Sequence, residues 1–447
     1  MFRKLLDFPS NSTADLLHRL DSLFGCIYLK NAGEDIVAFS PEQYCISTQQ
    51  QLYRYTRNHF THYQKDKSDP HLKHFFNFTV QSAPKQHSFQ GGYMGFIDYN
   101  YASQQYVDAQ TKSQPNFYMG IYKTFIKREN EQSFFYSLEA CAEEFFNFIQ
   151  DLLTTPVTQN QRFKLLSNCT ATWTKPQYDH AFTQVQEYIK AGDCYQINLT
   201  QEFTAKAHGL LLDTAEKFWT LTDAPYSGYL KINDFELLSC SPELFIDFEA
   251  ERKIITKPIK GTMPRYDDPI LDAQSKNALI QSKKDQAENV MIVDLLRNDL
   301  SVYAETGSVK TPKLFNIESF NQVHHMVSEV TATLKPDVNP FEVLFTALPG
   351  GSITGAPKIR AMQIIEELES APRGAYCGSM GYFNFDGTGS WNILIRSIQK
   401  YQDEVSLWAG GGITIASDCD AEYQECFDKV AAMLDLLNTW HQPQHES

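Results

Sequence analysis

The second half of the chain groups its expected strands in hairpins and places its expected helices between those groups. Apolar residues at helical spacing predict helices over 174–192, 271–297, 357–368 and 421–437. The first of them has a capping-box pair, Thr174 and Gln177, at its start and Gly192 at its end. Short apolar stretches between turn residues predict strands over 244–248, 253–256, 377–385, 391–398 and 405–409. Hairpin strands form antiparallel sheets, so the pattern favours an α+β fold with antiparallel sheets over a doubly wound parallel sheet.

The length and composition predict a large folded protein. The chain has 447 residues, of which 42% are hydrophobic and 13% aromatic, and this excludes a wholly disordered chain. At about 150 residues per domain, the length predicts two to three domains or one large composite one. A polar stretch at 154–162 (TTPVTQNQR) is a candidate boundary. We therefore predict an N-terminal subdomain over 1–165 and a second domain over 166–447, with the alternative that both are intertwined in one composite fold.

Charge and cysteine content restrict the partners and the compartment. The 54 acidic and 39 basic side chains give a net charge of −15, which argues against nucleic acid or an anionic membrane surface as the main partner. No apolar stretch approaches the roughly 18 residues that span a bilayer. The 9 cysteines are scattered without a CxxC, so a zinc ribbon or a disulfide scaffold is not expected. The N-terminus MFRKLLDFPS lacks a secretion signal, and we expect a cytoplasmic protein with reduced thiols.

Glu243 and Lys260 form the first pair that could do chemistry. A hairpin that turns near Ala250 and Glu251 places residue 243 opposite about residue 258, so both side chains lie at the open end of one hairpin. A partly desolvated lysine has a lowered pKa and can act as a nucleophile or a base, and a nearby carboxylic acid can protonate a leaving group. The alternative is a surface ion pair across a turn.

Two carboxylate pairs could hold a metal ion. Asp285 and Glu288 are three residues apart on one predicted helix, and Glu422 and Glu425 have the same spacing on another, so each pair shares a helix face. If the two faces met, the four carboxylates would form an oxygen-rich site suited to Mg²⁺, which takes one or two carboxylates together with water and substrate oxygens. The alternative is that both faces are solvated surface.

Arg396 lies in a predicted strand that is apolar on both faces, and it shares its side with Leu394 and Ile398. A buried charge needs a partner. That partner would be either a structural aspartate or glutamate, or a bound carboxylate held by the fork of the guanidinium. Both alternatives are open at this point.

Two glycine-rich segments could bring a ligand close to the backbone. The segment at 350–358 (GGSITGAPK) leads into a predicted helix, whose N-terminus attracts anions, but Ala356 and Pro357 stand where a Walker A loop has Lys and Ser/Thr. The segment at 409–413 (AGGGI) follows a predicted strand. A tight turn is the alternative for each. From the residues alone we expect a Mg²⁺-dependent enzyme that acts on a small polycarboxylate.

The same residues fall, in chain order, within motifs that resemble those of the chorismate-utilising enzymes. The resemblance runs from Trp173 to Met433, through AGDCYQINLTQ (191–201), SPELF (241–245), KPIKGTMPR (257–265), AENVMIVDLLRNDL (287–300), PGGSITGAPKIRAMQIIEELE (349–369), RGAYCGSMGYF (373–383), AGGGI (409–413) and AEYQECFDK (421–429). It implies an α+β fold in which large antiparallel β-sheets pack as a sandwich with helices on the outside. It also makes 166–447 the chorismate-binding catalytic domain.

Lys260 distinguishes among the activities of this family. The anthranilate, isochorismate and salicylate enzymes typically have alanine at this position, whereas a lysine in PIKGT resembles the subgroup of aminodeoxychorismate synthase component I. The resemblance implies amination of chorismate to 4-amino-4-deoxychorismate, on the 4-aminobenzoate branch toward folate. In it, Lys260 attacks ring C2, Glu243 acts as the general acid, and ammonia adds at C4 and expels the lysine. The alternatives are component I of anthranilate synthase and a non-catalytic chorismate-binding subunit that docks a glutaminase.

The resemblance also implies roles for the other residues. It places Mg²⁺ on Glu288 and Glu425, with Asp285 and Glu422 in the ligand shell or next to it. The substrate-binding residues would be Tyr376, Arg396 and Gly412 at the enolpyruvyl carboxylate, Ser352 and His325 along the pocket, and Lys429 at the ring carboxylate or a metal-bound water.

Two partners are implied in the same way. The chain has no glutaminase signature of the Gly-x-Cys-x-Gly kind, so the resemblance implies a separate class-I glutamine amidotransferase subunit that supplies ammonia. The segment FQGGYMGFIDYN (89–100) resembles a glycine-rich strand that helps form a tryptophan pocket in relatives, with Pro225, Tyr226 and Ser227 as candidate neighbours. Ordinary core packing is the alternative there.

Overall fold

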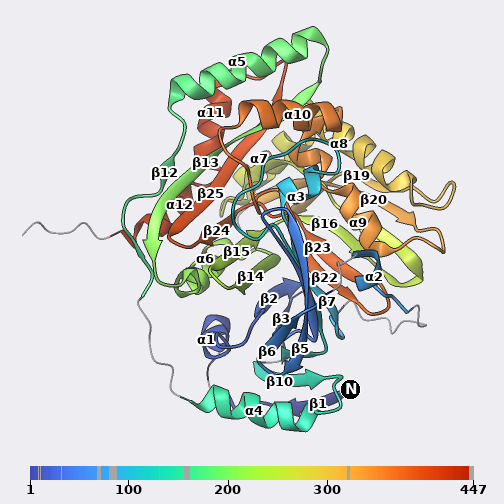
Figure 1. Cartoon of the computed structure of the whole chain (residues 1–447). Helices are drawn as coiled ribbons and strands as arrows, with labels where there is room; N and C mark the ends of the chain where they lie inside the picture. Colours follow the sequence, from blue (N-terminus) through green and yellow to red (C-terminus); the bar gives the residue numbers. More distant parts are fainter. Residues whose placement is uncertain are drawn as a thin grey trace, which may run out of the picture.

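The computed structural model describes residues 1–8, 10, 12–31, 33–67, 72–79, 88–129, 131–155, 162–319 and 323–441. Two large antiparallel sheets pack against each other, and helices lie around them (Figure 1). This confirms the predicted α+β fold with large antiparallel β-sheets packed as a sandwich. The boundary predicted at 154–162 falls mostly on 156–161, which lie outside the described residues.

The first sheet contains 13 strands within the described ranges. In order across the sheet they are β1 (Phe2–Leu5), β10 (Gln132–Ser137), β9 (Thr124–Glu129), β3 (Glu34–Ala38), β2 (Ile27–Asn31), β14 (Tyr226–Ile232), β15 (Phe235–Ser241), β24 (Ser397–Tyr401), β25 (Glu404–Thr414), β13 (Gln196–His208) and β11 (Lys164–Leu165). Two short strands, β12 (Thr170–Ala171) and β21 (Gly355–Ala356), also pair with β13.

The second sheet contains 12 strands in the same described part of the chain. Their order is β18 (Ile259–Pro264), β20 (Val323–Thr333), β17 (Lys253–Thr256), β16 (Leu244–Phe248), β23 (Gly389–Asn392), β22 (Ser379–Asn384), β7 (Gly92–Ile97), β8 (Phe117–Tyr122), β4 (Gln43–Thr48), β5 (Gln51–His59) and β6 (His62–Lys65). The remaining strand, β19 (Lys310–Ser319), pairs with β20.

Helices occupy the ends and outer faces of the sheets. They are α1 (Thr13–Arg19), α2 (Leu72–Phe75), α3 (Tyr99–Ser103), α4 (Ala142–Thr154), α5 (Lys175–Ala191), α6 (Ala215–Thr222), α7 (Pro269–Gln281), α8 (Lys283–Ser301), α9 (Pro340–Ala347), α10 (Lys358–Leu368), α11 (Cys419–Asp428) and α12 (Ala431–Asn438), with 3₁₀ turns η1 (Leu211–Thr214), η2 (Ala250–Arg252) and η3 (Gly351–Ile353). The helix predicted at 174–192 is confirmed as α5, with its capping box and with Gly192 at φ 83°.

Strands from distant parts of the chain pair within each sheet. β2 pairs with β14 at Tyr28 and Tyr229, and β7 pairs with β22 at Gly95 and Gly381. Apolar side chains of both sheets meet in one core, among them Ile27, Met94, Phe96, Leu230 and Met380. The domain boundary at 165 stays a prediction, and strands from both sides of it contribute to each sheet.

Two predicted helices are interrupted in the structure. The helix predicted at 271–297 is broken at Ser282, which is extended (φ −66°, ψ 103°) and caps α8 by accepting a hydrogen bond from the Asp285 amide at 3.3 Å. The helix predicted at 421–437 is broken at Lys429 and Val430, between α11 and α12. Each carboxylate pair still lies on a single helix, because the breaks fall outside the pairs.

The strand predicted at 391–398 is wrong. β23 ends at Asn392 in the second sheet, and β24 begins at Ser397 in the first sheet. The four residues between them carry the chain across the sandwich, with Arg396 at φ 50°. The glycines at 410–412 were predicted to follow a strand. They instead lie inside β25, which continues to Thr414.

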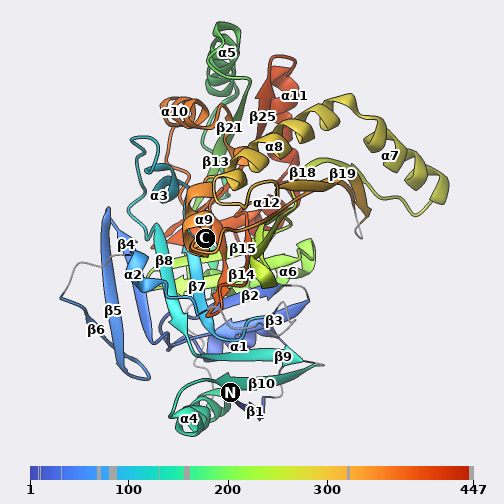
Figure 2. The ribbon, with the colours of Figure 1, turned by 90° about the vertical axis from the view of Figure 1, so that its right-hand side faces the viewer.

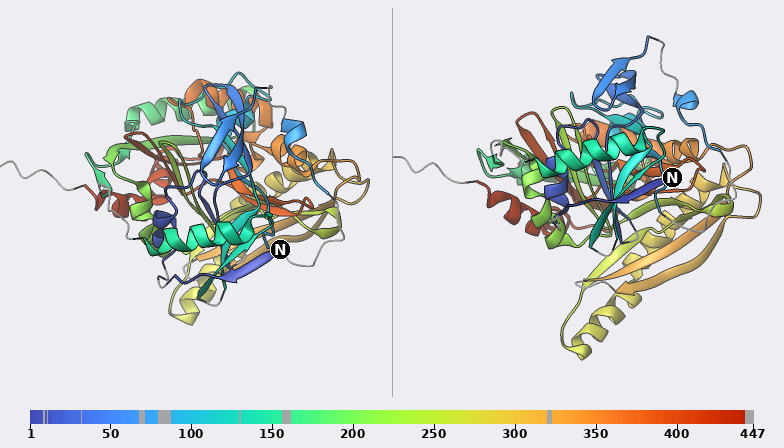
Figure 3. Two further views of the ribbon diagram at one scale, coloured as in Figure 1. Left: turned by 60° about the horizontal axis from the view of Figure 1, so that its bottom comes forward. Right: turned by 90° about the horizontal axis from the view of Figure 1, so that it is seen from below.

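A projecting part of the second sheet brings α8 to the site. α7, β19 and β20 extend from the body of the molecule, as Figures 2 and 3 show from other directions. α8 then returns along β18 and β20 to η3, so its first turns face the end of the first sheet. None of the helices that the structure describes is both long and apolar enough to cross a membrane.

Candidate active site

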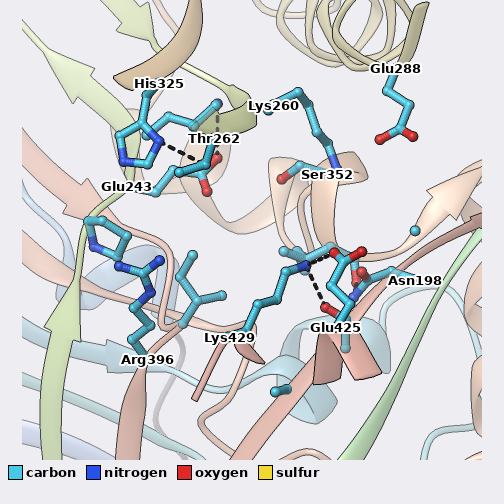
Figure 4. Close-up of a pocket in the computed structure, with 18 of the residues that line it drawn as sticks. Asn198, Glu243, Lys260, Thr262, Glu288, His325, Ser352, Arg396, Glu425 and Lys429 are labelled. Carbon is cyan, nitrogen blue, oxygen red and sulfur yellow. Dashed lines mark hydrogen bonds and ion pairs between the residues drawn. The ribbon is translucent and has the colours of Figure 1, made fainter. Parts of the chain in front are cut away.

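A cavity of about 450 Å³ lies where β13 and β25 of the first sheet meet β18 and β20 of the second, under α8 and α11. All the residues predicted for a site line it: Glu243, Lys260, Asp285, Glu288, His325, Ser352, Tyr376, Arg396, Gly412, Glu422, Glu425 and Lys429. Figure 4 shows most of them around the cavity, with Lys260 and Glu288 on one side and Lys429 and Glu425 on the other. The structure thus brings the set together, while the individual roles stay predictions.

The hairpin of β16 and β17 brings the segments of Glu243 and Lys260 to the same cavity. The register pairs Asp247 with Ile255 and Phe248 with Ile254, and past the strand ends the Ile259 amide donates to Glu243 Oε1 at 3.5 Å. The carboxyl group is buried, and no ion pair joins it to Lys260 among the described residues. The alternative of a surface ion pair is therefore wrong.

Burial shifts the pKa of each group in the direction that favours its neutral form. It raises the pKa of Glu243 to about 7, although the nearby Lys260 charge opposes that shift. It lowers the pKa of Lys260 below its ordinary value, against the attraction of the Glu288 carboxylate. Both shifts are in the direction that favours a nucleophilic amine and a carboxyl group that can donate a proton.

The four predicted metal-binding carboxylates face the cavity from two helices. Glu422 is buried and accepts a hydrogen bond from Ser417 Oγ at 2.7 Å, whereas Glu425 pairs with Lys429 at 2.6 Å. Burial is the main cause that raises the pKa of Glu288 and of Glu422, and in both the Glu425 carboxylate adds to it. The alternative of solvated helix surface is therefore wrong for Glu422, whereas Glu425 keeps 40% of its side chain exposed.

The donor set fits Mg²⁺ by its chemistry. A Cβ atom on Gly411 would meet Glu422 Oε2 at 2.8 Å and Glu425 Oε1 at 3.1 Å, so bare backbone leaves both carboxylates room beside it. Carboxylates from two sides of a polar pocket are the ligands that this ion prefers. No three acidic, His or Cys side chains in the described chain are close enough to share an ion as they stand.

Arg396 makes no side-chain hydrogen bond or ion pair with the residues that the structure describes. The alternative of a structural carboxylate is therefore wrong. Burial lowers its pKa, against the attraction of nearby Cys240 and Glu243, but an arginine stays charged. A partly buried, unpaired guanidinium that lines a cavity is suited to hold a carboxylate of a bound molecule.

The remaining predicted residues complete the lining. His325 Nδ1 lies 2.9 Å from Thr262 Oγ1, and burial lowers the pKa of this histidine to about 4, so it is neutral. Tyr376 stacks on Trp408 with ring centroids 5.9 Å apart. Lys429 Nζ also donates to the Gly410 carbonyl at 2.8 Å. A Cβ on Gly412 would lie 2.0 Å from Gln196 Nε2, so a side chain there would have to displace that amide.

Sequence reasoning missed several residues of the cavity. Asn198, Thr262, Lys284 and Trp408 also line it. Asn198 and Thr262 lie inside motifs that carried the resemblance, which was a usable signal. Lys284 is one of two adjacent lysines at the start of α8, and nothing in their spacing tells which one faces the pocket.

The residues predicted for a tryptophan pocket make contacts within the fold. The Ser227 hydroxyl donates to the Ala224 carbonyl at 3.0 Å, and Asn392 Nδ2 donates to the Tyr226 carbonyl at 3.1 Å. Tryptophan binding beside Pro225, Tyr226 and Ser227 stays a prediction.

Comparison with known proteins gives consistent matches. The family described as chorismate binding enzyme matches residues 41–435. Aminodeoxychorismate synthase component 1 of Salmonella typhimurium is 47% identical over 275 residues, which are 62% of this chain but only 60% of that protein. The Escherichia coli protein of the same name is 41% identical over 357 residues, 78% of this chain and 77% of that one. Anthranilate synthase component I from Streptococcus pneumoniae has a similar structure, with a TM-score of 0.77 at 25% identity over 90% of this chain and 92% of that chain.

Proposed function

This chain belongs to the chorismate binding enzymes, and from that premise we propose that it aminates chorismate to 4-amino-4-deoxychorismate. The nitrogen comes as ammonia from glutamine, released by a separate glutaminase subunit of the class-I amidotransferase type. The product enters 4-aminobenzoate and folate synthesis. Relatives named aminodeoxychorismate synthase component 1 support this proposal over the other activities of the family.

The observation that carries the proposal is that Lys260 lines the same cavity as Glu243. A reaction that replaces a hydroxyl by an amine on the same ring carbon can proceed through two displacements, and a covalent amine splits it into two easier steps. Lys260 has the lowered pKa that such a nucleophile needs. Glu243, with its pKa near 7, has the proton for the departing hydroxyl.

The proposed steps balance within the site. The Lys260 lone pair forms a bond to ring C2, the two ring double bonds shift, and the C4–O bond breaks. The leaving hydroxyl takes the proton of Glu243 and departs as water. Ammonia then adds at C4, the double bonds shift back, and the C2–N bond breaks. Glu243 recovers a proton from the attacking nitrogen, and Lys260 leaves as a neutral amine.

Binding residues surround this pair. Arg396, Tyr376 and the Gly412 backbone hold the enolpyruvyl carboxylate, and Ser352 and neutral His325 lie along the ring. Lys429 lies near the ring carboxylate. Glu288 and Glu425, with Asp285 and Glu422 beside them, would hold Mg²⁺, which would bind the ring carboxylate and draw electron density from the ring.

Product analysis tests the proposed function. Purified protein is given chorismate, Mg²⁺ and ammonium salt, with or without a class-I glutaminase subunit and glutamine, and products are identified by chromatography and mass. We expect 4-amino-4-deoxychorismate, which retains the pyruvyl group. Anthranilate with released pyruvate would place the chain in the tryptophan branch. Chorismate binding without turnover, even with the glutaminase, would favour a binding subunit.

The pH dependence follows from the two shifted groups. Glu243 donates only when protonated, a form that is lost as the pH rises through about 7. Lys260 attacks only as the free amine, a form that grows as the pH rises. We therefore expect kcat at saturating chorismate and ammonia to follow a bell with an alkaline limb near pH 7. In Glu243→Gln that alkaline limb should disappear along with about 10²-fold or more of the rate, and a limb that persists in the variant would assign it to another group.

A further inference from the structure

A buried ion pair lies directly behind the candidate site. Arg373 and Glu369 expose 1% and 2% of their side chains. The Arg373 Nε and Nη2 atoms donate to the two Glu369 carboxylate oxygens at 2.8 and 2.7 Å, which is a bidentate geometry. Such a pair is costly to desolvate and is retained where further hydrogen bonds use its charges.

The other donors of Arg373 reach two segments that line the cavity. Nη1 donates to the Ile353 carbonyl at 2.8 Å, and Nη2 also donates to the Asn198 carbonyl at 2.7 Å. Ile353 closes the 3₁₀ turn that carries Ser352, and Asn198 is itself a lining residue. The Arg373 side chain therefore adds a connection between η3 and the start of β13, which also meet where the Asn198 amide donates to the Thr354 carbonyl at 2.8 Å.

The carboxylate of the pair extends the same connection. Glu369 Oε1 accepts hydrogen bonds from the Thr200 amide at 3.0 Å and from its hydroxyl at 2.7 Å. The guanidinium also lies 4.6 Å from the Tyr99 ring centroid and 5.9 Å from that of Tyr376. Tyr376 is the third lining residue that this cluster touches.

We propose that Arg373 is a positioning residue, which with Glu369 holds Asn198, Ser352 and Tyr376 at the spacing that the bound substrate requires. Arg373 acts through these neighbours and does not itself line the cavity. The substrate in question is the chorismate of the proposed function, on which the kinetic part of the test rests. The structural part of the test is independent of any activity.

The chain offers a matched control for this proposal. Lys400 and Glu236 form another buried ion pair, at 3.3 Å with side-chain exposures of 9% and 2%. Glu236 contacts Tyr229 and Leu212, and none of these residues lines the cavity. Loss of Lys400 reports what the removal of a buried pair does to the fold alone.

The test compares Arg373→Lys with Lys400→Met in the full chain. Lysine keeps a charge near Glu369 but cannot also donate to both carbonyls. We expect faster amide hydrogen exchange at 197–200 and 351–354 in Arg373→Lys only. The Thr200 amide donates to Glu369, and the Asn198 amide donates to Thr354, next to the Ile353 carbonyl that Arg373 holds. We expect kcat/KM for chorismate to fall about 100-fold, as misplaced binding groups do, with KM raised, while Lys400→Met keeps its kinetics below its melting temperature.

A milder variant guards against loss of folding. Thr200→Val keeps the amide hydrogen bond to Glu369 and removes only the hydroxyl one, and we expect a smaller change of the same kind. Unchanged exchange at both segments in Arg373→Lys and Thr200→Val would overturn the positioning role. Equal kinetic losses in Lys400→Met would overturn it as well. If the unmodified protein does not turn over chorismate, the proposed function fails, and the exchange data still decide the positioning role.

Discussion

Lys260→Ala is expected to lower kcat for chorismate amination by roughly 10²- to 10⁴-fold. This is the range for removal of a positioned proton-transfer group, and the loss of a covalent nucleophile should cost at least as much. The physical reason is that ammonia would then have to displace the C4 hydroxyl without the covalent step at C2. The measurement uses ammonium salt as the nitrogen source, so that a lost glutaminase contact cannot produce the effect. Product is quantified by chromatography and mass.

The matched control is Lys257→Ala, three residues earlier in the same motif and outside the cavity lining. It should leave kcat within a factor of about two, because exposed or half-exposed substitutions away from a site change little. Mass spectrometry of unmodified protein quenched with chorismate and no ammonia should show an adduct at Lys260. Full activity of Lys260→Ala would remove the observation on which the proposed function rests.

Removal of divalent cations is the second change with a large expected effect. Chelation should reduce the rate on the order of 10³-fold, because a bound ion contributes several kcal/mol of charge stabilisation, and Mg²⁺ should restore it. Glu288→Gln should weaken Mg²⁺ binding itself, measured by titration calorimetry with Mg²⁺ alone. This readout does not depend on turnover.

Asp294→Asn is the control for the metal prediction. Asp294 is an acidic residue of the same helix, paired with Arg297 at 3.0 Å and exposed, and it lies outside the cavity lining. Its Mg²⁺ affinity should match that of the unmodified protein. Equal affinity of Glu288→Gln and the unmodified protein, or full activity in excess chelator, would refute the metal site.

Local patterns predicted much of the fold. They failed where a helix ends or the chain leaves a sheet while the pattern of polar and apolar residues stays the same. Ser282 interrupts a helix although apolar residues continue on both sides, because its side chain caps the next helix. The segment 391–398 would be apolar on both faces in one continuous strand and also in a crossing between sheets, because β23 and β24 are both buried. For this reason the sequence predicted Arg396 to lie in a strand. In the structure it lies in the connection between β23 and β24.

The candidate site was predictable to the extent that its parts are local. The three-residue spacing of each carboxylate pair is visible in the sequence, and so is the hairpin that joins Glu243 and Lys260. The meeting of α8 with α11 depends on long-range sheet pairing, which no local pattern contains, and only the resemblance to a family placed them together. Lys284 was missed because a single polar residue has no periodicity, whereas Asn198 lies in a motif that could have indicated it.

The pairing of β7 with β22 has a consequence for synthesis of the protein. About 280 residues of chain separate Ile97 from its partner Ser379. At roughly 5–20 residues per second, the ribosome completes β22 on the order of tens of seconds after β7 has emerged. During that interval the side of β7 that will pair with β22 has no partner strand, although its residues are buried in the finished sheet. Such an unpaired strand edge can bind strands of other chains. A nascent chain stalled before residue 379 is therefore expected to aggregate more readily than the completed chain.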